Sequence, residues 1–286
     1  MSLTKQKILN IQVTSSPKEK ILEHIKKYLD RSGDEGSPRS RKSKKSLVVL
    51  TPNPEQVVLA SRSSVFAGLL NQADVTLPDG IGIVWAARFL ESVPSRTDTT
   101  VISGRISGVD FMDDLVALAV KQRVSIGLIG GLGGLAVQAF ECLHQKHPKL
   151  SGWAEDGPEI RTDDTGIIED PGTHYWSQMV KKITTTKIQI LFVGLGAPKQ
   201  ELVIDKLATA YKVADISSPL VMMAVGGSFD VLAGRLKRAP LFIRSIGFEW
   251  FWRLLQEPWR WKRQLALPQF LFLLIREKLK ILVSQG

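Results

Sequence analysis

The chain has 286 residues, of which 44% are hydrophobic and 23% charged, a composition that excludes an intrinsically disordered protein and is typical of a globular one. A single cysteine, Cys142, excludes a framework of disulfides within the chain and fits a reducing compartment. The net charge of +10 is concentrated near the C-terminus, where residues 235–286 contain 11 Lys/Arg and 3 Asp/Glu, a net charge of +8.

Residues 1–30 predict a short strand (ILNIQV) and an amphipathic helix (PKEKILEHIKKYL), and the Ser-, Gly-, Arg- and Lys-rich residues 31–45 predict a flexible basic loop. From residue 46 onward, short apolar segments such as SLVVL, SIGLIG and IQILFVGL alternate with amphipathic helical segments, and residues 151–172 form an irregular acidic region. This alternation is typical of a Rossmann-like, mostly parallel α/β sheet with helices on both faces. We therefore expect residues 1–234 to form an α/β body, in which ligands bind beyond the carboxyl ends of the strands.

The chain changes character after about Gly234. Residues 235–286 contain four of the seven tryptophans, interleaved with arginines: Trp250, Trp252, Trp259 and Trp261. This composition predicts a basic, Trp-rich helical appendage. Its apolar run LALPQFLFLLI contains a proline and falls short of the roughly 18 apolar residues of a spanning helix. The start of the chain, MSLTKQKILNIQV, lacks the apolar core of a signal peptide, so we expect a cytoplasmic protein.

The appendage has three interpretations. Arginines and tryptophans beside an apolar segment fit the headgroup region of an anionic membrane surface. The same residue types bind single-stranded nucleic acid, but an uncharged run is unusual in such a groove. In the third interpretation the aromatic side chains simply pack the appendage onto the body. We expect a peripheral protein on the inner face of the cell membrane, with no nucleic-acid partner.

Two strand-to-helix turns contain candidate functional residues. Asp79 stands between a proline and a glycine in ADVTLPDGIGIVWAARF, where a short strand gives way to a helix and the residue can form a turn and cap that helix. The second turn, Gly131–Ala136, fits G-x-G-x-x-A, so an NAD(P)-binding oxidoreductase is an alternative. The acidic residue expected about 20 positions further on has no clear candidate, because Glu155 and Asp156 lie in a loop-like segment.

A series of motifs runs along most of the chain. In order they are TPNPEQ (51–56), LPDGIGIVWAAR (77–88), RISGVDFM (105–112), LIGG (128–131), VGLGAPKQE (193–201), GGSFDVLAG (226–234), KRAP (237–240) and GFEWFWRLLQEPWRWKR (247–263). Over roughly residues 46–265 this series resembles the WecB/TagA/CpsF family of bacterial glycosyltransferases. The resemblance implies an inverting enzyme that moves a sugar, of the N-acetylmannosamine type or a related hexose, from a UDP-sugar to a polyprenyl-diphosphate-linked sugar. The product would be a cell-surface polysaccharide or glycopolymer.

The resemblance also assigns catalytic roles to individual residues. The family's proposed general base falls on Asp79. The other residues that match the catalytic pocket are Thr51, Arg105 and Gln200. Arg105 would offset the charge that develops on the leaving UDP, unless it only forms a surface ion pair with Asp110 or Asp113.

Further residues are expected to bind substrate. They are Asn53, Gly80, Gly130, Gly131, Lys199, Glu201, Asp230, Arg253, Arg260 and Arg263. Lys199, Glu201 and Asp230 would hold the nucleotide, or merely satisfy helix ends. The glycines would let backbone N–H groups or the sugar approach closely, and the three arginines would contact the lipid diphosphate, or form a solvated helix face.

The sequence leaves several properties open. The four histidines show no metal spacing and no Asp-x-Asp element lies near the expected pocket, so we expect no metal or other cofactor. A noncatalytic sugar-nucleotide-binding protein is a further alternative. The donor sugar, the acceptor sugar and a homo-oligomeric state are not readable from the residues.

Overall fold

The computed structural model describes residues 2–30, 46–91, 101–163, 166–169 and 171–284. The predicted basic loop, residues 31–45, lies outside the described residues. None of the helices within the described part of the chain combines the length and the apolar character needed to cross a bilayer.

Six parallel strands form the central sheet in the order β4–β3–β10–β9–β5–β6. Their bounds are β3 (Ser46–Leu50), β4 (Val75–Thr76), β5 (Ser125–Gly130), β6 (Gly152–Glu155), β9 (Ile188–Gly194) and β10 (Leu220–Ala224). The central strand β10 is buried throughout. Its Val221 and Met223 belong to one hydrophobic cluster and its Met222 and Ala224 to another. Such strands read as continuous apolar runs because both faces of the sheet are covered. The predicted α/β class is therefore confirmed.

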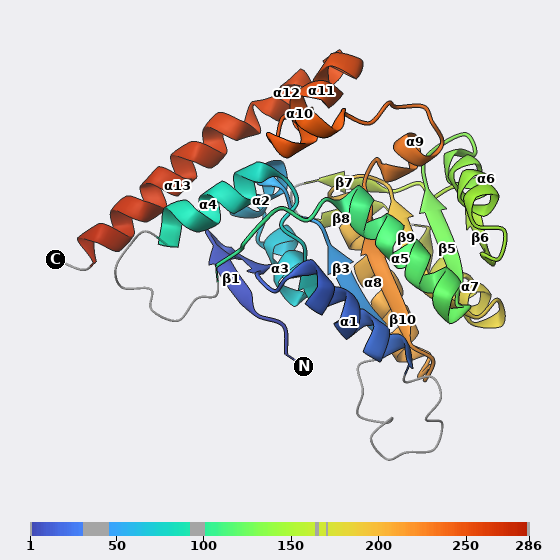
Figure 1. Cartoon of the computed structure of the whole chain (residues 1–286). Helices are drawn as coiled ribbons and strands as arrows, with labels where there is room; N and C mark the ends of the chain where they lie inside the picture. The colour runs from blue at the N-terminus through green and yellow to red at the C-terminus, as the bar shows by residue number, and fades with distance from the viewer. Residues whose placement is uncertain (1, 31–45, 92–100, 164–165, 170, 285–286) are drawn as a thin grey trace.

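Helices cover both faces of the sheet (Figure 1). One hydrophobic cluster includes side chains of α1 (Lys18–Leu29), α5 (Gly108–Gln122), α6 (Leu135–Lys146) and α9 (Ser228–Leu232). The other cluster includes side chains of α2 (Pro54–Arg62), α3 (Ser64–Gln72), α4 (Ile81–Glu91), α7 (Gly172–Thr185) and α8 (Lys199–Val213).

Two hairpins lie outside the central sheet. The prediction of a single strand at ILNIQV is wrong, because β1 (Lys5–Ile8) and β2 (Ile11–Thr14) form an antiparallel pair. The chain reverses at Leu9, whose φ of 53° lies in the left-handed region. The second hairpin, β7 (Arg161–Asp163) with β8 (Gly166–Glu169), and strand β6 both fall in the region expected to be irregular.

The C-terminal residues form a series of helices that lies across one edge of the sheet and then runs back along the body (Figure 1). They are α10 (Leu241–Ser245), α11 (Glu249–Gln256), a 3-10 turn (Pro258–Arg260), α12 (Trp261–Gln264) and α13 (Ala266–Val283). We call residues 235–284 the tail. Helix α13 packs against α2 and α4, and its Phe270 and Leu274 are buried in the same cluster as the body. The boundary near Gly234 stays a prediction.

Candidate active site

The carboxyl ends of the parallel strands meet at one edge of the sheet, and the predicted catalytic residues follow these ends. Thr51 follows β3, Asp79 follows β4, and Gln200 lies in the first turn of α8, after β9. A groove of about 440 Å³ runs along this edge. The predicted residues that line it are Thr51, Asn53, Asp79, Gly131, Gln200, Asp230, Arg253, Arg260 and Arg263. Folding therefore brings together residues that are far apart in the sequence.

Five predicted residues lie off this groove, of which Gly80 and Arg105 lie beside Asp79. Lys199 lines a neighbouring cavity, Glu201 is buried beneath the groove, and Gly130 ends β5 beside Gly194. A Cβ on Gly130 would lie 2.4 Å from the Gly194 carbonyl oxygen, so this glycine permits close packing of two strands. Gly131 does line the groove, but its N–H donates to the Gly194 carbonyl at 3.1 Å and is engaged in the protein.

Asp79 combines a turn backbone with a carboxyl group that faces the site. Its N–H donates to the Leu77 carbonyl at 2.8 Å, and Gly80 has a φ of 92°, which favours glycine at this turn. The carboxyl group faces Arg105, with 3.6 Å between Oδ1 and the Arg105 Nε, and the backbone N–H of Gly108. Asp79 and Gly80 also line a second cavity, of about 300 Å³, between the body and the tail.

The surroundings of Asp79 make its carboxylate a stronger base than an exposed aspartate. Burial raises the pKa of Asp79 from 3.8 to about 6, against the opposing charge of Arg105, while the negative charge of Glu249 adds to the rise. A carboxyl group with a pKa near 6 is still mostly ionised at neutral pH and accepts a proton more readily than one with a pKa near 4.

Arg105 pairs with two carboxylates. It lies 3.6 Å from Asp79, and its Nη2 donates a hydrogen bond to Glu249 of the tail. Asp110, one of the expected partners of Arg105, instead pairs with Arg238 at 2.7 Å. The sequence predicts no role for Glu249 or Arg238, although Glu249 lies in GFEWFWRLLQEPWRWKR and Arg238 in KRAP, because neither motif indicates which body residue these side chains will face.

The tail arginines form a concentrated positive site. Arg253 and Arg260 each donate a hydrogen bond of 2.8 Å to Glu257, which the sequence analysis also missed. Burial lowers the pKa of Arg260, and so does the neighbouring positive charge of Arg253 and Arg263. A Cβ on Gly227 would lie 2.1 Å from Nη2 of Arg253, so this glycine makes room for the guanidinium at the end of β10. Three arginines at one groove fit an anionic ligand.

A hydrogen-bond network beneath the groove holds its floor. Gln200 accepts a bond of 2.9 Å from the Gly226 N–H and donates one of 2.9 Å to Glu201. Gln56 donates to the same Glu201 oxygen at 3.2 Å and also completes a capping box with Asn53 at the start of α2. Burial raises the pKa of Glu201 to about 7. Gln200 and Asn53 are therefore fixed in position by the fold, as preorganised site residues are.

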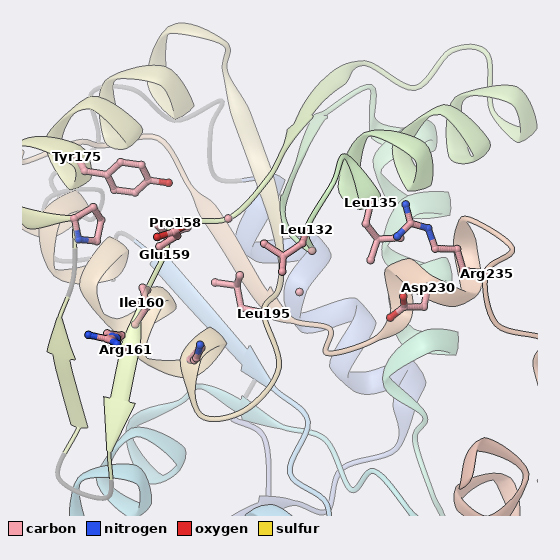
Figure 2. Close-up of a pocket in the computed structure, with 15 residues that line it drawn as sticks. Leu132, Leu135, Pro158, Glu159, Ile160, Arg161, Tyr175, Leu195, Asp230 and Arg235 are labelled. Atoms are coloured by element: carbon pink, nitrogen blue, oxygen red, sulfur yellow. The ribbon is translucent and has the colours of Figure 1, made fainter. Parts of the chain in front are cut away.

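A third cavity, of about 1180 Å³, lies over the β5 side of the sheet edge. Figure 2 shows Tyr175 and Arg161 on one side of it, Asp230 and Arg235 on the other, and Leu132 between them. Gly131, Gly194 and Asp230 are shared with the groove, so the two spaces are adjacent. Within the described residues there is no group of three or more His, Cys, Asp and Glu that could hold a metal ion.

The family described as "Glycosyl transferase WecG/TagA/CpsF family" matches residues 6–283 of the chain. The chain belongs to this family. It is therefore a glycosyltransferase, as the motif series predicted. A Bacillus subtilis (strain 168) protein is 29% identical over 233 residues, 81% of this chain and 80% of its own length. A Staphylococcus aureus (strain MW2) protein is 28% identical over 274 residues, 96% of this chain and 93% of its own length. Both are named N-acetylglucosaminyldiphosphoundecaprenol N-acetyl-beta-D-mannosaminyltransferase.

Family membership decides between the alternatives that the glycine-rich turn left open. In this glycosyltransferase the N–H of Gly134, at the start of α6, donates to the Asp156 carboxylate at 3.0 and 3.2 Å. In a dinucleotide-binding protein, the helix N-terminus after such a turn faces the pyrophosphate. Here the Asp156 carboxylate of the protein itself accepts the hydrogen bond from that helix N-terminus.

Proposed function

We propose that this glycosyltransferase is an inverting enzyme that moves an N-acetylmannosamine-type sugar, or a related hexose, from a UDP-sugar to a sugar linked to polyprenyl diphosphate. The names of the two relatives support the acceptor class and the transferred sugar. The observation that carries the mechanism is the Asp79 carboxyl group, with a pKa of about 6, in a groove that also contains three arginines. The product would enter a cell-surface glycopolymer.

Asp79 is proposed as the general base. Inversion needs one displacement, in which the acceptor hydroxyl oxygen bonds to the anomeric carbon as the bond from that carbon to UDP breaks. The hydroxyl proton passes to the Asp79 carboxylate, which is roughly nine-tenths ionised at pH 7 for a pKa near 6.

Fixed positive charges and a preformed pocket would place the two substrates. Arg253, Arg260 and Arg263 would bind the acceptor diphosphate, since guanidinium groups make bidentate, charge-assisted contacts with phosphate oxygens. The donor nucleotide would occupy the third cavity, which Lys199 and Asp230 line and which shares lining residues with the groove. Thr51, Gln200 and Arg105 would then surround the reacting sugar, and Arg105 would offset the charge on the leaving UDP.

The tail would hold the enzyme on the inner face of the membrane. Its helices leave large apolar side chains in solvent, with Phe242 67% and Trp259 70% exposed, on a segment with a net charge of +8. Exposed aromatic surface together with basic residues suits an anionic lipid surface. The lipid-linked acceptor would be met there, next to the tail arginines.

The experiment is a UDP-release assay with purified protein, a short polyprenyl-diphosphate sugar and a panel of UDP-sugars. We expect turnover with UDP-N-acetylmannosamine or a related donor, and a β-configured product by NMR. Asp79→Asn should lose most turnover, whereas Asp114→Asn, which removes a carboxylate paired with Lys18 on another surface, should not. Turnover by Asp79→Asn at the wild-type rate would exclude Asp79 as the base, and an α-configured product would exclude inversion.

A further inference from the structure

Glu249 belongs to the tail and lines the second cavity together with Asp79 and Arg105 of the body. It is the first residue of α11, and one carboxylate oxygen accepts a hydrogen bond from Nη2 of Arg105. The other oxygen lies 3.6 Å from Nε of Arg238. The three side chains are only 19–22% exposed, so this arrangement is better shielded from solvent than a surface ion pair.

Glu249 determines how Arg105 meets Asp79. The Arg105 Nε lies 3.6 Å from the Asp79 carboxylate, which is beyond hydrogen-bond distance, and this buried Nε has no hydrogen-bond partner among the described residues. A guanidinium without a second partner would close onto a carboxylate and form a bidentate pair. Glu249 occupies the Nη2 side of Arg105 and so competes with that arrangement.

We propose that Glu249 is a positioning residue: by holding Arg105, it keeps the Asp79 carboxylate open to the acceptor hydroxyl and links the state of the base to docking of the tail. This inference rests on the proposed role of Asp79. The three residues come from separate segments, after β4, before α5 and at the start of α11. The arrangement therefore forms only when α11 lies over the sheet edge.

The charges around the pair fix the direction of the effect. Burial is the main cause of the raised pKa of Asp79; Arg105 and the Gly108 N–H lower it, and Glu249 raises it. The other charged side chains packed around Glu249 and its partners are Arg238, Asp110 and Arg244. Glu249→Gln removes a negative charge near Asp79 and frees Arg105 to approach it. Both changes favour the carboxylate, so the pKa of Asp79 falls in this variant.

The test is the pH dependence of UDP release, measured from pH 5 to 9 with the short acceptor, for wild type and Glu249→Gln. In Glu249→Gln we expect the acidic limb of the pH–rate profile to move to lower pH by at least half a pH unit. We also expect kcat at pH 8 to fall about tenfold, because Asp79 is a weaker base and is partly blocked by Arg105. Glu249→Asp keeps the charge and should keep the wild-type limb. Glu277→Gln, the same change elsewhere in the tail, is the matched control and should match wild type. Circular dichroism checks that each variant is folded.

A direct readout separates this inference from the proposed function. Titration of ¹³C-labelled aspartate carboxyls by NMR, with the Asp79 signal assigned from Asp79→Asn, measures the pKa without catalysis. A lower Asp79 pKa in Glu249→Gln supports the coupling of Glu249 to Asp79 even if Asp79→Asn were to keep its turnover. In that case the base assignment fails, and with it the part of the inference that concerns the acceptor hydroxyl. An unchanged titration of Asp79 in Glu249→Gln overturns the inference, as does a limb that moves equally far in Glu249→Asp.

Discussion

The Asp79 carboxyl group is expected to destabilise the folded protein at neutral pH, so Asp79→Asn should raise the free energy of unfolding while it removes activity. Burial raises the pKa of this group from 3.8 to about 6 in the folded state, so the unfolded chain gives up the proton at a lower pH. A group with a raised folded pKa adds stability below pH 3.8, and that stability is lost as the pH rises through about 6. The difference between these two pKa values corresponds to about 3 kcal/mol in the free energy of unfolding.

Urea unfolding followed by circular dichroism measures this contribution of Asp79 to the free energy of unfolding. Asp79→Asn should be more stable than wild type by about 1.5 kcal/mol at pH 5 and about 3 kcal/mol at pH 8. Asp114→Asn is the control, because its carboxylate forms a solvent-accessible ion pair with Lys18 and its loss should change stability by less than about 1 kcal/mol. If wild type and Asp79→Asn were equally stable at pH 8, or if the difference in their free energies of unfolding did not grow with pH, burial would not raise the pKa of Asp79.

Four further outcomes follow from the site. In wild type, kcat/KM should fall about tenfold per pH unit below pH 6, and a pH–rate profile that is flat down to pH 5 contradicts the pKa of about 6. Asp79→Asn should lower kcat by about 10²–10⁴-fold. Arg260→Gln should raise KM for the short lipid-linked acceptor at least about tenfold and leave KM for the UDP-sugar unchanged, whereas Lys262→Gln, its exposed neighbour, should change neither. EDTA should leave turnover intact, since guanidinium groups supply the positive charge; loss that magnesium or manganese restores would show a metal requirement. Trp259→Ser should reduce co-sedimentation with anionic liposomes relative to wild type, and undiminished binding would show that this side chain does not meet lipid.

Much of the fold could be predicted from the sequence because its strands are buried on both faces. The continuous apolar runs that became β5, β9 and β10 are short and alternate with amphipathic helical segments, which favours the interior of a covered parallel sheet. The N-terminal hairpin could not be predicted in this way. The apolar residues of ILNIQV are interrupted only by Asn10 and Gln12, as in one half-buried strand, and the reversal depends on the left-handed backbone of Leu9, which its side chain does not favour.

The site was predictable to the extent that it follows the strand ends. Thr51, Asp79 and Gln200 converge because parallel strands end at one edge, a consequence of topology alone. The partners of the arginines were not predictable. Glu249 meets Arg105 across a sequence separation of 144 residues, and no local pattern in a charged helix states which body residue it will face.

The position of the tail explains why the chemistry needs more than the sheet edge. Asp79 owes its raised pKa mainly to burial. It lines the second cavity, whose other walls include Trp250 and Trp252 of the tail. The same tail supplies Glu249 and the arginines of the groove. Its helix α13 is held on the body by the buried side chains of Phe270 and Leu274, whereas α11 has no buried residue and meets the body through the pair of Glu249 with Arg105. Apolar contacts are insensitive to the charge changes of catalysis, and we infer that this packing keeps the tail on the body while Asp79 takes up and releases a proton.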